Sequence, residues 1–316
     1  MKDENVRGTP GDIGGEAAAL QMFLQSNVKA IGYQIARQLA EKLPLVPIQS
    51  MPPRVDLKSK ACTQDDVESL WFAYWCSQMK AAPVYHRKLW EFCYILQALY
   101  DAGVLREGTH GVGFGCGEEP LPSLFAGMGV AITATDAPLD TAGAWVTSGQ
   151  YAQSREPLFK SFLCEREAFD RLVSYVPADM RKIPANFAGQ FDFTWSACAL
   201  EHLGSIEAGL TFIEKSLECV KPGGVAVHTT EWNFASEDRT LEDPACVLFL
   251  RKHFEDLAAR LTGQGCIVAP FDFEVGSGFL DKFIDVPPYE HPQHAHLRLM
   301  LGKFSSTSFG IIVSKL

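Results

Sequence analysis

The strongest constraint on the fold of this chain is a glycine-rich segment at residues 112–120, VGFGCGEEP. Gly113, Gly115 and Gly117 alternate with other residues there, and Asp136 ends the next apolar run. A glycine turn between a strand and a helix lets backbone N–H groups approach a ligand closely, and a carboxylate after the second strand suits the two hydroxyls of a ribose. The pattern predicts an α/β fold that binds a nucleoside or nucleotide.

The spacing of the glycines favours one type of ligand over another. A dinucleotide fingerprint, G-x-G-x-x-G, needs its third glycine at position 118, which is Glu118. An NAD-dependent dehydrogenase is therefore a less favoured alternative. A nucleoside with a short charged tail, such as S-adenosylmethionine, fits the G-x-G-x-G spacing better.

From about residue 85 to the C-terminus, the chain resembles the class I S-adenosylmethionine-dependent methyltransferases. Three further segments carry the resemblance in the family's order. They are similar to its adenine-binding turn, to its fourth strand with the loop beyond, and to its fifth strand with the preceding turn: 179–184 (DMRKIP), 191–203 (FDFTWSACALEHL) and 217–230 (LECVKPGGVAVHTT). The resemblance implies a Rossmann-like fold with a seven-stranded, mostly parallel sheet and an antiparallel last strand. It also implies S-adenosyl-L-methionine as cofactor and S-adenosyl-L-homocysteine as product.

The chain departs from the family at Gly111, two residues before the first glycine of the turn. The family usually has Asp or Glu there, and that carboxylate steadies the glycine loop. His110 and Glu118 are the two candidates to replace it.

The resemblance also implies which residues bind the cofactor. The glycines supply the backbone turn, and the other residues contact the ribose, the adenine and the methionine part: Gly113, Gly115, Gly117, Asp136, Asp179, Met180, Ser196 and Arg87. Arg87, within the segment Tyr85-His86-Arg87-Lys88, is the candidate cation for the methionine carboxylate. Each polar residue has a structural alternative: a helix cap for Asp136, a turn for Asp179, and a solvated helix face for Arg87.

Methyl transfer from a sulfonium is an in-line displacement that needs mainly positioning and the exclusion of water. An alcohol acceptor also needs a base for its proton. In parallel sheets the ligand lies beyond the carboxyl ends of the strands, where Glu201, His202 and Glu231 are expected. We predict that His202 takes the proton while Glu201 or Glu231 orients the imidazole. Hydrogen bonding at the start of the following helix is the alternative role for His202.

No metal is predicted, although two alternatives stay open. The Glu201-His202 pair is similar to quinone-type O-methyltransferases, which place acidic residues and a histidine around a divalent ion. His291, His294 and His296 also cluster in one connection, where a polar loop lining the acceptor site is favoured over zinc, and a plain surface loop is the alternative.

Composition limits the remaining classes of function. The 316 residues are 47% hydrophobic and 21% charged, which suits a globular enzyme. A formal net charge of −10 without a basic block argues against a nucleic-acid partner. No membrane span or leader is indicated, so a cytoplasmic location is expected. Nine scattered cysteines without a CxxC pair are expected to be reduced thiols.

The expected organisation begins with a disordered tail at 1–15, followed by an N-terminal helix and a Pro-rich linker at 16–62. The methyltransferase domain is expected at 63–316, with a helical cap at 63–105. Apolar residues recur at helical spacing before the linker: Leu20, Leu24, Val28, Ile31, Ile35 and Leu39. This stripe suits packing on the domain, a lid, or the seam of a homodimer through residues 16–43.

The elements of the domain are also expected at definite positions. Strands are predicted near 109–114, 130–135, 172–177, 191–196, 224–230, 265–273 and 307–315. Helices are predicted near 120–128, 206–220 and 243–263.

The sequence therefore predicts an S-adenosylmethionine-dependent methyltransferase that O-methylates a carbohydrate or small-molecule hydroxyl. The carbohydrate interpretation depends on the segments 232–240 (WNFASEDRT) and 281–299, which resemble bacterial methyltransferases associated with surface-glycan assembly. A catalytically silent partner protein that binds S-adenosylmethionine is the alternative from another class.

Overall fold

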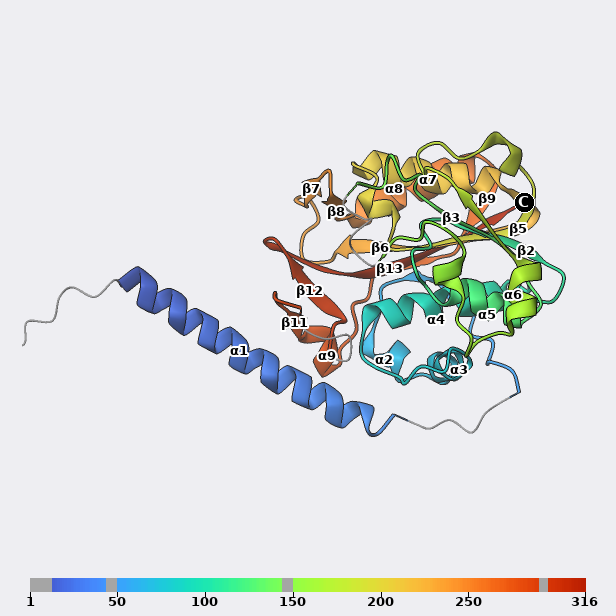
Figure 1. Cartoon of the computed structure of the whole chain (residues 1–316). Coiled ribbons are helices and arrows are strands. Elements are labelled where there is room, and N and C mark those ends of the chain that lie inside the picture. The colour runs from blue at the N-terminus through green and yellow to red at the C-terminus, as the bar shows by residue number, and fades with distance from the viewer. Residues whose placement is uncertain (1–12, 44–49, 144–149, 290–294) are drawn as a thin grey trace, which may run out of the picture.

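The computed structural model describes residues 13–43, 50–143, 150–289 and 295–316. Its centre is a nine-stranded sheet in the order β11-β12-β13-β6-β5-β2-β3-β4, with β9 also paired to β13 (Figure 1). The strands of this sheet are β2 (His110–Gly113), β3 (Ala131–Asp136), β4 (Val173–Pro177), β5 (Phe191–Ala197), β6 (Val220–Asn233), β9 (Cys266–Val268), β11 (Ile284–Asp285), β12 (Arg298–Leu301) and β13 (Phe304–Lys315).

The directions of the strands confirm the mostly parallel α/β fold. β4, β3, β2, β5 and β6 pair in parallel, and β13 runs antiparallel to β6 from Ser306↔Asn233 to Ser314↔Val225. Each expected strand has a counterpart, although the strand expected at 265–273 is divided into β9, which pairs with β13, and β10 (Phe271–Asp272), which lies outside this sheet. The short strands β11 and β12 extend the sheet beyond β13. The last ten residues of β6 are buried in succession, as expected for a strand covered on both faces.

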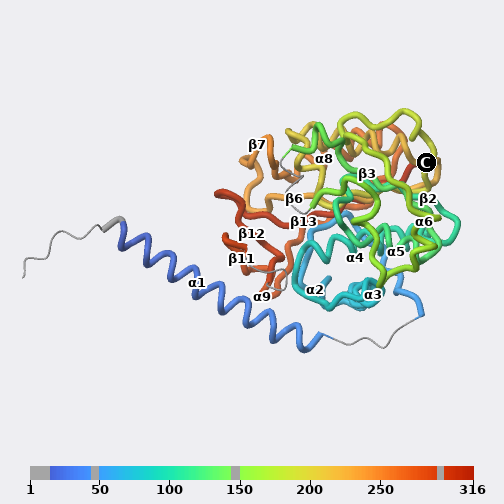
Figure 2. The backbone as a smooth tube through the Cα atoms, in the orientation of Figure 1, coloured from blue at the N-terminus to red at the C-terminus, as the bar shows by residue number. Residues whose placement is uncertain are grey.

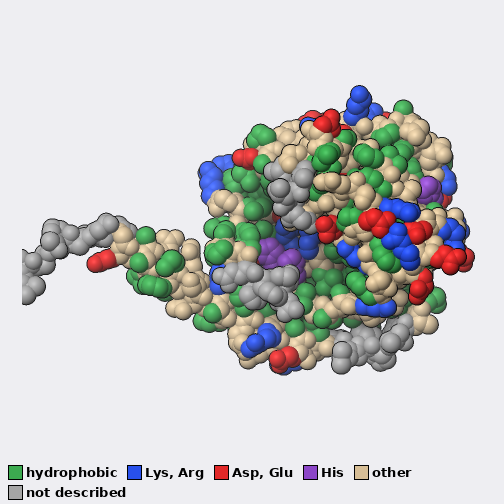
Figure 3. All heavy atoms as spheres, viewed as in Figure 1, with side chains coloured by type: hydrophobic (Ala, Val, Ile, Leu, Met, Phe, Trp, Pro, Cys, Tyr) green, Lys and Arg blue, Asp and Glu red, His purple; other side chains and the backbone are tan. Residues whose placement is uncertain are grey.

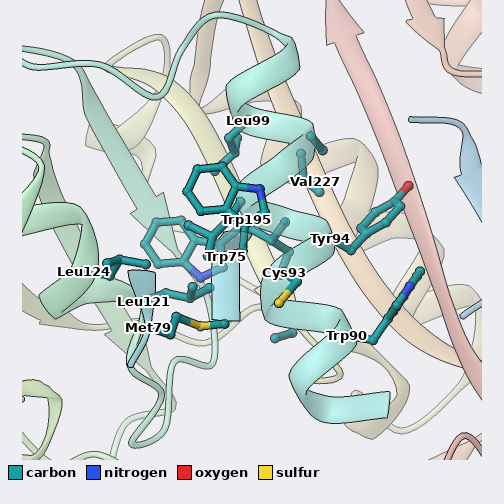
Figure 4. Close-up of a cluster of buried hydrophobic side chains, with 14 of the residues drawn as sticks. Trp75, Met79, Trp90, Cys93, Tyr94, Leu99, Leu121, Leu124, Trp195 and Val227 are labelled. Atoms are coloured by element: carbon teal, nitrogen blue, oxygen red, sulfur yellow. The ribbon is translucent and has the colours of Figure 1, made fainter. Parts of the chain in front are cut away.

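Helices cover both faces of the sheet (Figure 1). One layer contains α3 (Leu70–Gln78), α4 (Arg87–Asp101), α5 (Leu121–Gly127) and α6 (Arg166–Leu172), and the other contains α7 (Ile206–Glu218) and α8 (Arg251–Gly263). Figure 4 shows large side chains from α3, α4 and the sheet meeting in the first layer. Trp90 and Tyr94 stack there at 4.7 Å between ring centroids, and Trp75 donates a 2.8 Å hydrogen bond from Nε1 to Gln97.

Two predicted helical regions differ in detail. The block from Thr63 contains α2 (Gln64–Val67), α3 and α4, and the Thr63 hydroxyl accepts a 3.2 Å bond from the backbone N–H of Asp66. The helix predicted at 243–263 begins only at Arg251, because 242–247 form a hairpin of β7 (Glu242–Asp243) and β8 (Cys246–Val247). Outside the main sheet, β1 (Ser59–Lys60) pairs with β10 (Phe271–Asp272).

Helix α1 (Ile13–Ala40) runs along one side of the molecule and extends past it (Figures 1 and 2). It begins within the tail predicted to be disordered, of which residues 1–12 lie outside the described part. Only the end of its apolar stripe packs on the body: Leu39 contacts the core, whereas Leu24, Val28 and Ile31 are 56–59% exposed. The described helices include none with the length and apolar character to cross a membrane.

Candidate active site

A cavity of about 470 Å³ lies at the carboxyl edge of the parallel strands. Figure 3 shows histidine and Lys or Arg side chains gathered near a hollow on the face seen in Figure 1. The residues that line the cavity and carry the argument below are Lys88, Gly115, Gly117, Glu118, Glu119, Asp136, Asp179, Met180, Cys198 and His202. The structure therefore brings together most of the residues that the sequence predicted to bind the cofactor.

The glycine turn after β2 is tied directly to Asp136. The backbone N–H of Gly117 donates a 3.0 Å bond to Oδ2 of Asp136, which also accepts a 3.1 Å bond from the N–H of Ala152. Gly117 has φ +51°, and a Cβ there would lie 2.5 Å from the carbonyl oxygen of Gln150, so only glycine fits. Burial raises the pKa of Asp136, and these backbone donors oppose the shift. Asp136 therefore organises the turn as well as facing the cavity.

The far end of the cavity is formed after β4. Asp179 and Met180 line it, in the place predicted for adenine contacts. The Asp179 carboxylate also accepts a 2.8 Å bond from Nη2 of Arg181 and another 2.8 Å bond from the Arg181 backbone N–H. The hydrogen bond from the Arg181 side chain lowers the pKa of Asp179, which keeps this rim of the cavity anionic.

The departure at Gly111 has a packing cause. A Cβ at Gly111 would lie 2.3 Å from the Phe193 ring, so no acidic side chain fits there. His110 does not replace it, because it stands at the opposite end of β2 with Nε2 3.0 Å from the Thr133 hydroxyl. Glu118 lines the cavity, and so does the neighbouring Glu119, which the sequence analysis did not single out.

Arg87 and Ser196 lie behind the cavity wall. Nη2 of Arg87 forms an ion pair with Glu231, and Nη1 lies 3.1 Å from Glu91. The Ser196 hydroxyl is buried and lies 2.8 Å from Nδ1 of His228. Neither residue is part of the cavity lining, so their predicted contacts with the methionine part stay predictions.

The described cations that line the cavity are Arg181, which pairs with Asp179, and Lys88, the neighbour of Arg87. Nζ of Lys88 lies 3.0 Å from Oε2 of Glu91 and 3.4 Å from the carbonyl oxygen of Ala197. Although burial disfavours the charged form, Cys198 and Glu91 raise the pKa of Lys88 above its ordinary value. The signal was present in the sequence, because Arg87 and Lys88 both stand in the segment proposed for this contact.

His202 lines the cavity next to Cys198. Its Nδ1 lies 2.7 Å from the carbonyl oxygen of Ala245. A carbonyl oxygen only accepts, so Nδ1 carries the proton and Nε2 has the lone pair. The capping role at the next helix belongs to Ser205, whose hydroxyl accepts a 3.1 Å bond from the N–H of Ala208.

The two carboxylates expected to orient His202 are engaged elsewhere. Glu201 is 1% exposed and accepts a 3.0 Å bond from the Thr230 hydroxyl. Glu231 is 4% exposed and pairs with Arg87. Nδ1 of His202 contacts a backbone carbonyl, and the charge of Glu201 interacts with His202. Orientation of the imidazole by Glu201 or Glu231 therefore stays a prediction.

Two groups of residues are relevant to the alternative that the site binds a metal ion. Among the described residues, potential ligand atoms of Cys198, Glu201 and Glu231 lie within 4.8 Å of one another. The Arg87 guanidinium bound to Glu231 occupies this region with positive charge, which disfavours a cation. His291 and His294 lie outside the described residues, and His296 is 2.8 Å from Asp285 through Nδ1.

No protein-family model matches the chain, and no curated protein matches it in sequence. A proposed sarcosine dimethylglycine methyltransferase from Galdieria sulphuraria is similar in structure, with TM-score 0.43 and 14% identity over 66% of each chain. Phosphoethanolamine N-methyltransferase 2 of Haemonchus contortus, in complex with S-adenosyl-L-methionine, gives TM-score 0.37 and 16% identity over 55% of this chain and 37% of that chain. A proposed Zn-dependent alcohol dehydrogenase from Rhodobacter sphaeroides gives TM-score 0.41 and 11% identity over 69% and 89%.

The chain spans less than two thirds of the length of the first two of these structures, namely 66% and 37%. At such TM-scores and identities the similarities do not assign an activity, and the three proteins differ in chemistry. The function has to be derived from the cavity of this chain.

Proposed function

We propose that the chain is an S-adenosyl-L-methionine-dependent methyltransferase. The observation that carries the proposal is the position of Asp136, which faces the cavity while holding the glycine turn through Gly117. A carboxylate beside backbone N–H groups suits a ribose next to a glycine turn. The volume of about 470 Å³ also suits a ligand of this size.

When bound, the cofactor supplies a methyl group on a positively charged sulfur. The residues of this chain hold and screen the reactants: Asp136 for the ribose, Asp179 and Met180 for the adenine, and the glycine turn for the part between. His202 accepts the proton of the acceptor hydroxyl at Nε2, because the Ala245 carbonyl keeps its proton on Nδ1. Glu201 and Glu231 are not part of the cavity lining, but their negative charges raise the pKa of Arg87, and Glu201 also raises the pKa of Lys88. They therefore keep both cations charged.

The proposed acceptor is a hydroxyl of a carbohydrate or of another small molecule. Support comes from the segment 281–299, which resembles glycan-assembly methyltransferases and contacts the first turn of α4. The N–H of His296 donates a 2.8 Å bond to the carbonyl oxygen of Tyr85, and the N–H of Arg87 donates a 3.1 Å bond to that of His296. His296 of this segment therefore lies beside Arg87, the residue that precedes Lys88.

Calorimetry followed by turnover tests the proposal. The protein is titrated with S-adenosyl-L-methionine, S-adenosyl-L-homocysteine and NAD, and then assayed for S-adenosyl-L-homocysteine formation with sugars, small acids and quinols. We expect binding of the first two ligands and turnover with a hydroxyl acceptor. Binding without turnover favours the catalytically silent partner protein, and saturable binding of NAD alone favours a dehydrogenase.

Asp136→Ala is expected to weaken S-adenosyl-L-homocysteine binding by about 1.5–3 kcal/mol, because the charged partner of the ribose hydroxyls is lost. Asp136→Asn keeps one acceptor for the Gly117 and Ala152 N–H groups and is expected to lose less. Calorimetry measures both affinities, and the exposed Asp140→Ala variant is the matched control. Equal affinity of Asp136→Ala and the control removes Asp136 from the site.

A cytoplasmic location is proposed on the state of the cysteines. All nine lie in the described residues, and none of them forms a disulfide. Free thiols suit a reducing compartment. The net charge of −10 supports a small-molecule or glycan acceptor over a nucleic acid.

We also propose that two copies pair through α1. Five large apolar side chains lie on one side of the helix and are 56–60% exposed: Leu20, Phe23, Leu24, Val28 and Ile31. At about 100 Å² each they offer about 500 Å² per copy, and so about 1,000 Å² in a pair, which reaches the size of specific interfaces. A two-fold pair sets a face against itself, and residues 17–28 carry no charge that such a pair would repel.

The double substitution Leu24→Glu, Val28→Glu is expected to convert a dimer into a monomer, because it places like charges in that seam. Sedimentation equilibrium measures the mass of each variant. Ser26→Glu, on the other side of the same helix, is the matched control and is expected to stay dimeric. A monomeric wild-type protein at all concentrations contradicts the proposal.

A further inference from the structure

One buried acidic residue that lines the cavity has no role in the proposed methyl transfer. Glu119 follows the glycine turn, lines the cavity and is only 8% exposed. Its Oε1 accepts a 2.7 Å bond from Nε1 of Trp195, which fixes the carboxyl group from below. Among the described residues, no Lys, Arg or His nitrogen lies within 4.0 Å of this carboxylate, so Glu119 is buried without a counter-ion.

An isolated buried carboxylate is costly, and the protonation of Glu119 reflects this cost. Burial raises its pKa to about 8, while the Trp195 hydrogen bond and the charge of Lys88 oppose the shift. Cys116, in the glycine turn, and Asp136, on β3, are the other titratable groups that act on it. A cation brought next to Glu119 would restore the ionised form.

Two of the described residues that line the cavity are cations, Lys88 and Arg181, and Arg181 is already paired with Asp179 at 2.8 Å. Lys88, on α4, lines the cavity with 37% of its side chain exposed and is only partly neutralised by Glu91, which also pairs with Arg87. The cavity therefore contains a buried acidic group directly after the glycine turn, Glu119, and an incompletely neutralised basic group, Lys88. A ligand that carries both an ammonium and a carboxylate matches this pair.

We infer that Glu119 and Lys88 form a two-point receptor for the amino-acid end of the cofactor: Glu119 accepts its α-ammonium group, and Lys88 donates to its carboxylate. The inference depends on the proposed function and deepens it. It also accounts for Gly111: the carboxylate that Phe193 excludes from β2 is supplied from the far side of the glycine turn. Ligands that share the nucleoside but lack the amino-acid end are expected to bind weakly.

The test compares S-adenosyl-L-homocysteine with 5′-methylthioadenosine, which has the same nucleoside and thioether without the amino-acid end. Calorimetry on the wild type, Glu119→Gln and Lys88→Met gives both affinities. Each substitution is expected to weaken S-adenosyl-L-homocysteine binding about ten- to hundredfold and to leave 5′-methylthioadenosine within about threefold. Glu218→Gln, at an exposed acid of α7 that is not part of the cavity lining, is the control and is expected to change neither.

A second readout follows from the protonation of Glu119. Below about pH 8 the free protein holds a proton on Glu119, and the ligand's ammonium expels it. We therefore expect wild-type affinity for S-adenosyl-L-homocysteine to rise as the pH rises from 6 to 8. Titrations in buffers of different ionisation enthalpy are expected to show proton release, and Glu119→Gln is expected to abolish both effects.

The outcomes separate the two proposals. If the wild-type protein does not bind S-adenosyl-L-homocysteine, the proposed function fails. If it binds, but Glu119→Gln and Lys88→Met match the control on folded protein, the two-point receptor is wrong while the proposed function stands. Circular dichroism confirms folding, which Glu119→Gln favours because its amide oxygen still accepts the Trp195 bond.

Discussion

Glu231→Leu is expected to lower the free energy of unfolding by about 3–5 kcal/mol, because it leaves the Arg87 guanidinium buried without its closest counter-ion. The Arg87 and Glu231 side chains are 12% and 5% exposed, so water cannot replace the lost partner. Glu91 remains, but it already serves both Arg87 and Lys88. Among the described residues, Nε of Arg87 has no hydrogen-bond partner even in the intact cluster. Urea unfolding measures the decrease in the free energy of unfolding, and the curves of all variants are fitted with one common dependence of that free energy on urea concentration.

Two variants separate this buried pair from an ordinary surface pair. Glu218→Leu removes an exposed acid that lies 2.7 Å from Lys215 and is expected to cost less than about 1 kcal/mol. The double variant Arg87→Met, Glu231→Leu removes both charges and is expected to recover much of the loss. If Glu231→Leu costs no more than Glu218→Leu, the pair does not stabilise the fold.

The ion-pair cluster of Arg87, Glu91 and Glu231 also determines the position of Lys88. Arg87 ties the first turn of α4 to β6 through Glu231 and to β13 through the Ser308 hydroxyl, 3.2 Å away. Lys88 is the next residue of that turn, so its ammonium is placed by the contacts of its neighbour. The buried acids thus contribute to the site through position, without contacting the reactants.

Much of the fold could be predicted from periodic and turn signals. Apolar runs separated by glycine turns marked β2, β3, β5 and β6, because buried parallel strands are nearly continuous apolar segments. The start of α8 could not be predicted in this way. The hairpin of β7 and β8 depends on backbone pairing between Glu242 and Val247, which leaves no apolar period in the sequence.

Some residues of the site could likewise be placed from the sequence, and others could not. Asp136 is the last residue of β3, and its place at the cavity edge could be predicted because ligands bind at the carboxyl ends of parallel strands. Arg87 and Lys88 are separated by about 100° around a helix, so the sequence could not say which one faces the cavity. Glu118 and Glu119 both line the cavity, and the sequence could not say which of them would be buried. The partner of His202 is a backbone carbonyl, which carries no side-chain signal at all.

His202→Asn is expected to lower turnover by about 10²–10⁴-fold, which is the usual contribution of a general base. The asparagine amide can still donate toward the Ala245 carbonyl but has no basic nitrogen at the position of Nε2. The variant therefore removes the base and keeps the local hydrogen bond. The measurement is S-adenosyl-L-homocysteine formation with the acceptor found in the turnover panel.

Binding and acceptor chemistry decide between a base and a merely structural residue. S-adenosyl-L-homocysteine affinity is expected to stay within about threefold of the wild type, because the loss lies in a step that only the reacting complex reaches. Added imidazole is expected to restore part of the rate of His202→Ala by supplying the missing base. An acceptor that is already ionised needs no base and is expected to lose little rate. A His202→Asn variant that keeps full turnover with a hydroxyl acceptor would show that the proton leaves by another route.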